Sequence, residues 1–149
     1  MNDDEQFIRR ALELAAEAAE NGDVPVGAIL VTGEHIIETR NERERRPDPT
    51  AHAEMLAIQA AARRLGAWRI GGTLYVTKEP CPMCAGAIAG ARIERLVFGC
   101  SDPKGGAVGG AIDVLRSAAV NHHVEITSGV LEDETATQLR EYFRRKRER

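Results

Sequence analysis

Two short motifs in the chain place metal-ligating side chains beside a carboxylate. The first is His-Ala-Glu at 52–54, and the second is Pro-Cys-Pro-Met-Cys at 80–84. One imidazole and two thiolates form a ligand set that suits zinc. Three protein ligands leave the fourth tetrahedral position to water, which distinguishes a catalytic zinc site from a closed structural one. The two motifs therefore predict a catalytic zinc ion held by His52, Cys81 and Cys84.

Each motif alone allows another interpretation. A Cys-x-x-Cys pair also occurs in redox proteins and as one half of a structural zinc knuckle. The redox interpretation lacks its usual strand context, and the knuckle lacks a second ligand pair. A zinc measurement separates the redox alternative from a metal site.

Both motifs stand where helices are predicted to begin. The pattern predicts a helix over 50–65 with a cap at Asp48 or Thr50, and a second helix that opens at Pro80. Helix N-termini favour thiolates over thiols, because their free N–H groups and the helix dipole stabilise negative charge. The histidine and glutamate of the first motif are two residues apart and do not share a helix face. They can reach one site only near the helix end.

The rest of the chain alternates between helical and strand patterns. A first helix and a hairpin precede strands that are separated by helices, and this order predicts an α/β fold. We expect a three-layer α/β/α sandwich with a five-stranded mixed sheet. The remaining predicted helices are 1–20, 112–119 and 133–145; the strands are 24–31, 36–40, 73–77, 96–98 and 124–127; the loops are 41–49 and 101–110.

Length and composition limit the class of protein. The chain has 149 residues, which suits one domain over 1–149. Its formal charge is −3, so the whole molecule is not a basic nucleic-acid binder, although local basic patches are allowed. Three cysteines do not form a secreted disulfide framework. With an acidic N-terminus and no apolar run long enough for a membrane span, we expect a soluble cytoplasmic protein.

The paired motifs match the zinc deaminase signature His-x-Glu…Pro-Cys-x-x-Cys. Over nearly its whole length the chain is similar to the bacterial tRNA-specific adenosine deaminases, within the cytidine/deoxycytidylate deaminase superfamily. The zinc motif is common to that superfamily, whereas the flanking runs are more specific to the tRNA enzymes. The matching residues are 24–28, 41, 48–54, 73–77, 79–81, 83–87, 92–93, 97–99, 121–122 and 124–127.

This resemblance implies a fold, a reaction and partners. It implies a cytidine-deaminase-like fold, one Zn²⁺ per subunit, a homodimer, and no nucleotide cofactor or membrane. The implied substrate is the wobble adenosine in a tRNA anticodon loop, with tRNA-Arg the first candidate, converted to inosine with release of ammonia. An anticodon-loop base is already unpaired, so its extrusion costs little. Glu54 is the implied general acid and base and is not a zinc ligand.

Four residues acquire substrate roles by the same resemblance. Asn41 is expected to hydrogen-bond the flipped nucleoside, and Val26 to line its pocket. Asp102 and Lys104, in the loop after the fourth strand, are expected to face the RNA. From the residues alone, Asn41 can equally close a turn after its strand, and the glycines at 105, 106, 109 and 110 can be simple flexibility.

The C-terminal segment is strongly basic. Residues 139–149 contain six basic and two acidic side chains, with Tyr142 and Phe143 among them. Basic residues beside aromatics suit a single-stranded RNA loop. With the resemblance, this predicts RNA contacts from Phe143 and Arg144. The alternative is a solvated helix with two core aromatics.

Two further features and two rival functions remain. Arg43, Arg45 and Arg46 form a second basic cluster interrupted by glutamates, and Cys100 is expected to be a small buried thiol. The first rival is a guanine, cytosine or free-nucleoside deaminase with the same zinc site. The second is a non-catalytic, zinc-stabilised RNA-binding protein, against which Glu54 argues, because a structural site needs no general base.

Overall fold

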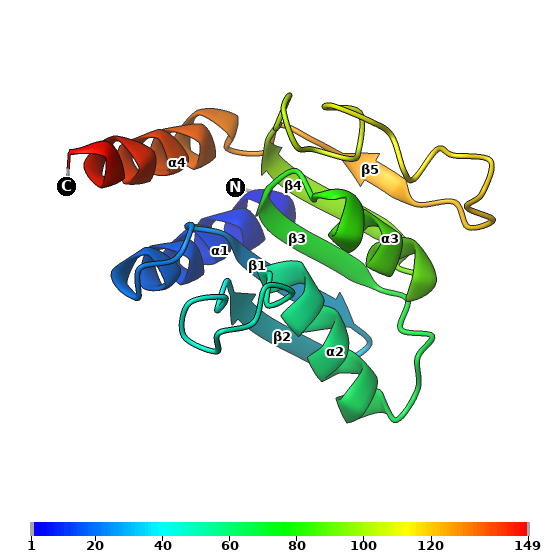
Figure 1. Cartoon of the computed structure of the whole chain (residues 1–149). Coiled ribbons are helices and arrows are strands. Elements are labelled where there is room, and N and C mark those ends of the chain that lie inside the picture. The colour runs from blue at the N-terminus through cyan, green and yellow to red at the C-terminus, as the bar shows by residue number, and fades with distance from the viewer. Residues whose placement is uncertain (1, 149) are drawn as a thin grey trace.

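The computed structural model describes residues 2–148 and contains a five-stranded mixed sheet (Figure 1). The strands lie in the order β2-β1-β3-β4-β5. β1 is antiparallel to β2 and β3, whereas β3, β4 and β5 run parallel. The bounds are β1 Gly27–Thr32, β2 His35–Arg40, β3 Thr73–Lys78, β4 Arg95–Cys100 and β5 Glu125–Thr127.

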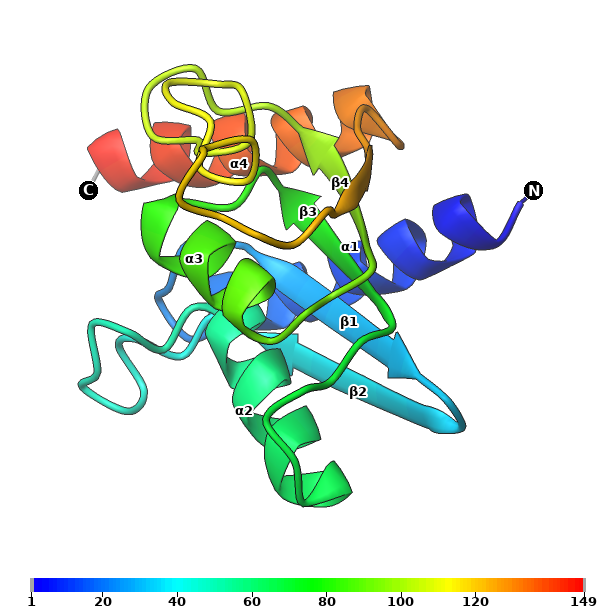
Figure 2. The same ribbon diagram turned by 90° about the vertical axis from the view of Figure 1, so that its right-hand side faces the viewer.

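Helices cover both faces of the sheet (Figure 2). α1 (Asp3–Glu20) and α4 (Glu132–Arg147) lie on one face, and α2 (Ala53–Leu65) and α3 (Pro82–Gly90) lie on the other. Alternate strand residues point to opposite layers, as the period of a strand requires. Leu74 and Val76 join the core beneath α2 and α3, while Tyr75 packs with α1. This arrangement confirms the predicted three-layer α/β/α fold.

The two motif-bearing helices begin later than the sequence predicts. α2 begins at Ala53 rather than at residue 50, and α3 begins at Pro82 rather than at Pro80. The predicted cap at Asp48 or Thr50 is wrong. The Asp48 carboxylate instead accepts hydrogen bonds from the backbone N–H and the hydroxyl of Thr50, which closes a turn before the helix.

The predicted helix over 112–119 is also wrong. The segment forms turns and an isolated bridge between Val108 and Asp113. Its backbone bonds with the preceding loop, because the N–H of Val114 donates to Ala107 and the N–H of Gly109 donates to Ile112. These bonds to the preceding loop replace the helical ones, although the apolar spacing is compatible with a helix.

The other elements follow the prediction with shifts of a few residues. β1 begins at Gly27 rather than at residue 24, and β4 extends over 95–100 rather than 96–98. Asn2 caps α1 by accepting from the N–H of Glu5 at 2.9 Å. Among residues 2–148, no helix is long and apolar enough to cross a membrane.

Candidate metal centre and active site

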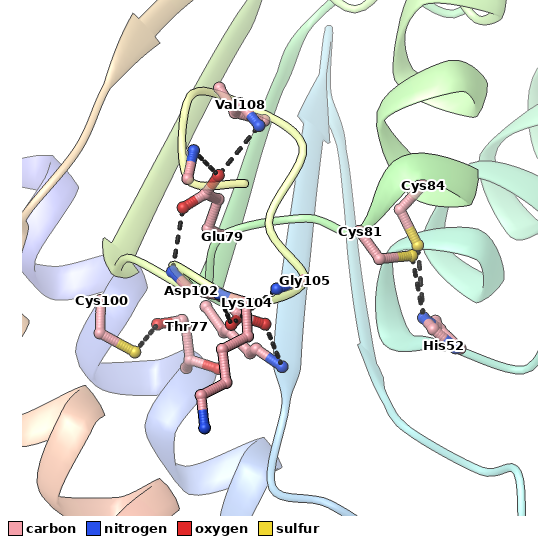
Figure 3. Close-up of polar contacts among 12 residues, drawn as sticks. His52, Thr77, Glu79, Cys81, Cys84, Cys100, Asp102, Lys104, Gly105 and Val108 are labelled. Atoms are coloured by element: carbon pink, nitrogen blue, oxygen red, sulfur yellow. Dashed lines mark hydrogen bonds and ion pairs between the residues drawn. The ribbon is translucent and has the colours of Figure 1, made fainter. Parts of the chain in front are cut away.

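The structure brings the three predicted zinc ligands together. Nδ1 of His52 lies 3.6 Å from Sγ of both Cys81 and Cys84, and the three ligand atoms lie within 4.8 Å of one another. Both sulfur atoms point toward the imidazole in Figure 3. Zn–S and Zn–N bonds in a tetrahedral site separate sulfur and nitrogen by about 3.6 Å. The donor types and their spacing therefore fit zinc.

Helix starts position all three ligands. His52 is the N-cap of α2, Cys81 is the N-cap of α3, and Cys84 lies in the first turn of α3. Pro82 occupies the first helical position, where its missing N–H costs nothing and its fixed φ suits the helix. Pro82 thus directs the chain from Cys81 into α3. The role of this proline was not evident from the sequence.

The electrostatics of the cluster favour thiolate at Cys81. The hydrogen bond that Cys81 accepts from the thiol of Cys84 lowers the pKa of Cys81. The neighbouring imidazole of His52 also contributes, and together they bring this pKa to about 3. The same hydrogen bond and burial raise the pKa of Cys84, so this thiol keeps the proton of the pair. The hydrogen bond with Cys81 also raises the pKa of His52. Metal binding at this site must therefore release protons from Cys84 and compete with protons at His52.

Glu54 is buried next to the ligand cluster. Its side chain is 4% exposed, and burial raises the pKa of the carboxyl group. Glu54 lines a cavity of about 100 Å³ together with His52 and Cys81. A carboxyl group with a raised pKa beside a metal site and a cavity has the properties of a general acid and base.

Val26 and Asn41 line the same cavity. The Asn41 amide also forms two hydrogen bonds with the backbone. Its Oδ1 accepts from the N–H of Ala53 at 2.8 Å, and its Nδ2 donates to the carbonyl of Val24 at 3.2 Å. Asn41 thereby satisfies a free N–H group at the start of α2 and ties β2 to the segment before β1. Both the structural and the site interpretations remain compatible with its position.

Asp102 and Lys104 do not line this cavity. Asp102 folds its own loop by accepting from the N–H groups of Lys104 and Gly105, both at 3.1 Å. Its other carboxylate oxygen lies 3.1 Å from Nζ of Lys78, a residue that does line the cavity. The loop is therefore connected to the site through Lys78.

Phe143 and Arg144 lie on α4 and do not line the cavity either. Phe143 is 41% exposed, and Tyr142 is half-buried with its hydroxyl donating to the carbonyl of Gly22. The alternative of two core aromatics is therefore wrong. Arg144 forms ion pairs with Glu141 and Glu148 on the helix surface.

Three further residues line the cavity, and of these the sequence analysis singled out only Arg43, as part of the basic cluster. Lys78, Glu79 and Arg43 contribute to the lining. Arg43 pairs with the buried carboxylate of Asp23 at 3.1 Å, so this arginine of the basic cluster is an anchor of the 41–49 loop. In the sequence, Glu79 stands two residues before Cys81, within the matching run 79–81. Cys100 is buried, as expected.

Comparisons with known proteins agree with this geometry. A model of the MafB19-like deaminase family matches residues 1–147. A tRNA-specific adenosine deaminase from Bacillus subtilis (strain 168) is 48% identical over 151 aligned residues, which cover 100% of this chain and 94% of that protein.

Two solved structures extend the comparison. One comes from a study of A-to-I editing by tRNA:A34 deaminases at the wobble position of transfer RNA; its TM-score is 0.86 at 43% identity, over 90% of this chain and 99% of the other. A guanine deaminase from Bacillus subtilis has a TM-score of 0.62 at 41% identity, over 68% of this chain and 66% of the other. The first likeness thus covers more of both chains.

Proposed function

The chain belongs to the MafB19-like deaminase family, and on that premise we propose that it is a zinc-dependent hydrolase that converts the wobble adenosine of a tRNA anticodon loop to inosine. The observation that carries the proposal is the juxtaposition of Glu54 with the cluster of His52, Cys81 and Cys84 at one cavity, in a chain whose full-length relatives are tRNA-specific adenosine deaminases. The first substrate to test is tRNA-Arg.

The overall reaction adds water at C6 of adenine and releases ammonia, which leaves inosine. His52, Cys81 and Cys84 would hold one Zn²⁺ per subunit. A zinc ion held there would lower the pKa of water in the site toward about 7. Glu54 takes a proton from the attacking water and returns protons to the ring nitrogen and the departing amine. Burial suits Glu54 to both steps because it raises the pKa of the carboxyl group.

The substrate contacts belong to the same proposal. Val26 and Asn41, on the cavity wall, would contact the flipped nucleoside. Asp102 and Lys104 would face the RNA from the loop that follows β4. Phe143 and Arg144 would contact RNA from α4, where an exposed aromatic ring stands among basic side chains.

The domain organisation, the compartment and the oligomeric state of the protein are also proposals. We infer that residues 1–149 form one deaminase domain. The basic helix expected over about 133–149 is α4, which extends over Glu132–Arg147 in the structure, and residue 149 lies outside the described residues. The unpaired Cys81, Cys84 and Cys100 suit a reducing compartment, which supports the cytoplasm. A homodimer is supported by the resemblance to the tRNA enzymes, and sedimentation of the zinc-loaded protein tests it.

Ammonia release from a panel of substrates tests the function. The panel contains tRNA-Arg with a wobble adenosine, free adenosine, cytosine and guanine, each offered to protein whose zinc content has been measured. We expect one zinc per chain and ammonia from the tRNA alone. Release from free guanine with the tRNA untouched would keep the chemistry but replace the substrate, in line with the guanine deaminase likeness.

A further inference from the structure

We propose that Glu79 is a positioning residue of this site. Its buried carboxylate fixes the glycine-rich loop 101–110 against the segment that carries Cys81, and so holds Asp102 and Lys104 in place for the RNA substrate. The part of this inference that concerns RNA rests on the proposed function. The part that concerns the loop rests on the contacts described below.

The Glu79 carboxylate accepts three backbone hydrogen bonds from one loop (Figure 3). Oε1 accepts from the N–H of Asp102 at 2.9 Å. Oε2 accepts from the N–H of Val108 at 2.9 Å and from the N–H of Gly110 at 2.8 Å. The three donors lie near the start and the end of the loop, so one side chain ties both parts of the loop together.

The burial of Glu79 makes these bonds important. The residue is 3% exposed, and it lines the cavity that also contains Glu54. Within residues 2–148, no basic side chain forms an ion pair with it. A buried carboxylate without a cation is costly unless hydrogen bonds replace its hydration. Here the loop N–H groups provide that replacement, so loop and carboxylate stabilise each other.

The glycines of the loop allow this close approach. A Cβ atom at Gly106 would lie 2.3 Å from the carboxyl carbon of Glu79. A Cβ atom at Gly110 would lie 2.7 Å from each Glu79 oxygen and 2.3 Å from the carbonyl oxygen of Asp102. Both positions exclude a side chain because the loop backbone packs directly on the carboxylate. Contact with Glu79, rather than flexibility, accounts for glycine at these two positions.

The anchored loop is connected to the site on two sides. The N–H of Ala107 donates to the carbonyl of Pro80 at 2.9 Å, next to the ligand Cys81. Asp102 forms its ion pair with Lys78 on the cavity wall. Release of the loop would therefore disturb the rim where the RNA is proposed to bind, whereas the ligands on α2 and α3 would keep their helix contacts.

The test compares Glu79→Gln with wild type. Glutamine keeps the size of the side chain but turns an NH₂ group toward loop N–H donors, so at least one bond is lost. We expect hydrogen–deuterium exchange of the 101–110 amides to accelerate about tenfold or more. We also expect KM for the tRNA to rise about tenfold with kcat within about threefold of wild type and zinc retained. Glu94→Gln is the matched control, because Glu94 also accepts a backbone N–H, from Gly72, away from the site.

A second variant reaches the same loop without altering Glu79. Gly110→Ala should push the loop away from the carboxylate and reproduce the faster exchange and the higher KM, and it carries the test if Glu79→Gln does not fold. Unchanged loop exchange in both folded variants would overturn the inference. Faster exchange with an unchanged KM would overturn the positioning role and leave a structural one. A wild-type protein inactive on tRNA would instead reject the proposed function, while the exchange data would still decide whether Glu79 anchors the loop.

Discussion

At the scale of single residues, Glu54 carries the sharpest prediction. Glu54→Ala should retain one zinc per chain and lose at least about a hundredfold in kcat, because a general acid and base contributes roughly 10²–10⁴-fold. Metal analysis and single-turnover deamination of tRNA measure the two effects separately. Glu34→Ala is the control, since Glu34 is exposed in the hairpin turn. Loss of zinc together with activity would assign Glu54 a structural role instead.

Asn41 offers a second residue-scale test, because its amide supports α2 and lines the cavity. Asn41→Ala should lower the free energy of unfolding by about 1 kcal/mol through the free N–H of Ala53. It should also lower kcat/KM for the tRNA about tenfold if the amide contacts substrate. Urea unfolding and kinetics well below the melting temperature separate these contributions. A stability loss with unchanged kinetics would leave Asn41 with its structural role alone.

The sequence predicts the zinc ligands because their types and spacing are local. Cys81 and Cys84 are three residues apart, and His52 stands in its own short motif. The roles of Glu79 and Asp23 cannot be predicted from local residue types and spacing. Apart from Arg43 and the local bond to Val24, their partners are backbone N–H groups of loops 21 to 31 residues away. Backbone donors have no residue type, so no sequence pattern reveals them.

At the scale of elements, Asp23 anchors the 41–49 loop beside the site. Its carboxylate accepts from the N–H groups of Val24 and Glu44 and pairs with Arg43. Burial alone would raise the pKa of Asp23, but these donors hold it below the ordinary value of 3.8. The native carboxylate is thus stabilised relative to the unfolded chain. This contribution is fully present above the unfolded pKa and is lost as the pH falls through the lower native pKa.

Asp23→Ala should therefore lower the free energy of unfolding by about 2 kcal/mol at neutral pH. The difference in the free energy of unfolding between wild type and Asp23→Ala should decrease as the pH falls below about 4. Urea unfolding over a pH series measures it, with Glu34→Ala as a control that shows no gap. A difference that stays constant into acid would mean that the carboxylate charge contributes nothing.

The order of elements is predictable from the sequence, but some boundaries are not. Segments with strand patterns alternate with segments that have helical periodicity, and this order predicts the five strands and the helices that cover them. The segment 112–119 has helical spacing, yet its backbone bonds with residues 107–109. The early start predicted for α2 fails because Asp48 forms a turn with Thr50 rather than a helix cap. In both cases a competing hydrogen bond decides the structure.

At the scale of the whole molecule, the basic end of α4 should contribute to RNA affinity. Residues 144–149 hold five basic side chains and one acidic one. A truncation after Phe143 should weaken tRNA binding, reduce the salt dependence of the affinity and leave zinc in place, because phosphate contacts release counterions. Binding measured over a salt series checks this. An unchanged affinity and salt slope would leave this segment as a solvated helix end.

The central claim is that this zinc site deaminates the wobble adenosine of tRNA. The most direct test is to sequence tRNA-Arg after reaction with zinc-loaded wild type and with Glu54→Ala, because inosine is read as guanosine in a cDNA copy. The account predicts that the wobble adenosine changes to a guanosine read with wild type, that the other adenosines do not, and that Glu54→Ala leaves the tRNA unchanged. Two results would contradict the account. The first is a wobble adenosine left unaltered by a wild-type protein that deaminates another substrate, and the second is conversion by Glu54→Ala at the wild-type rate.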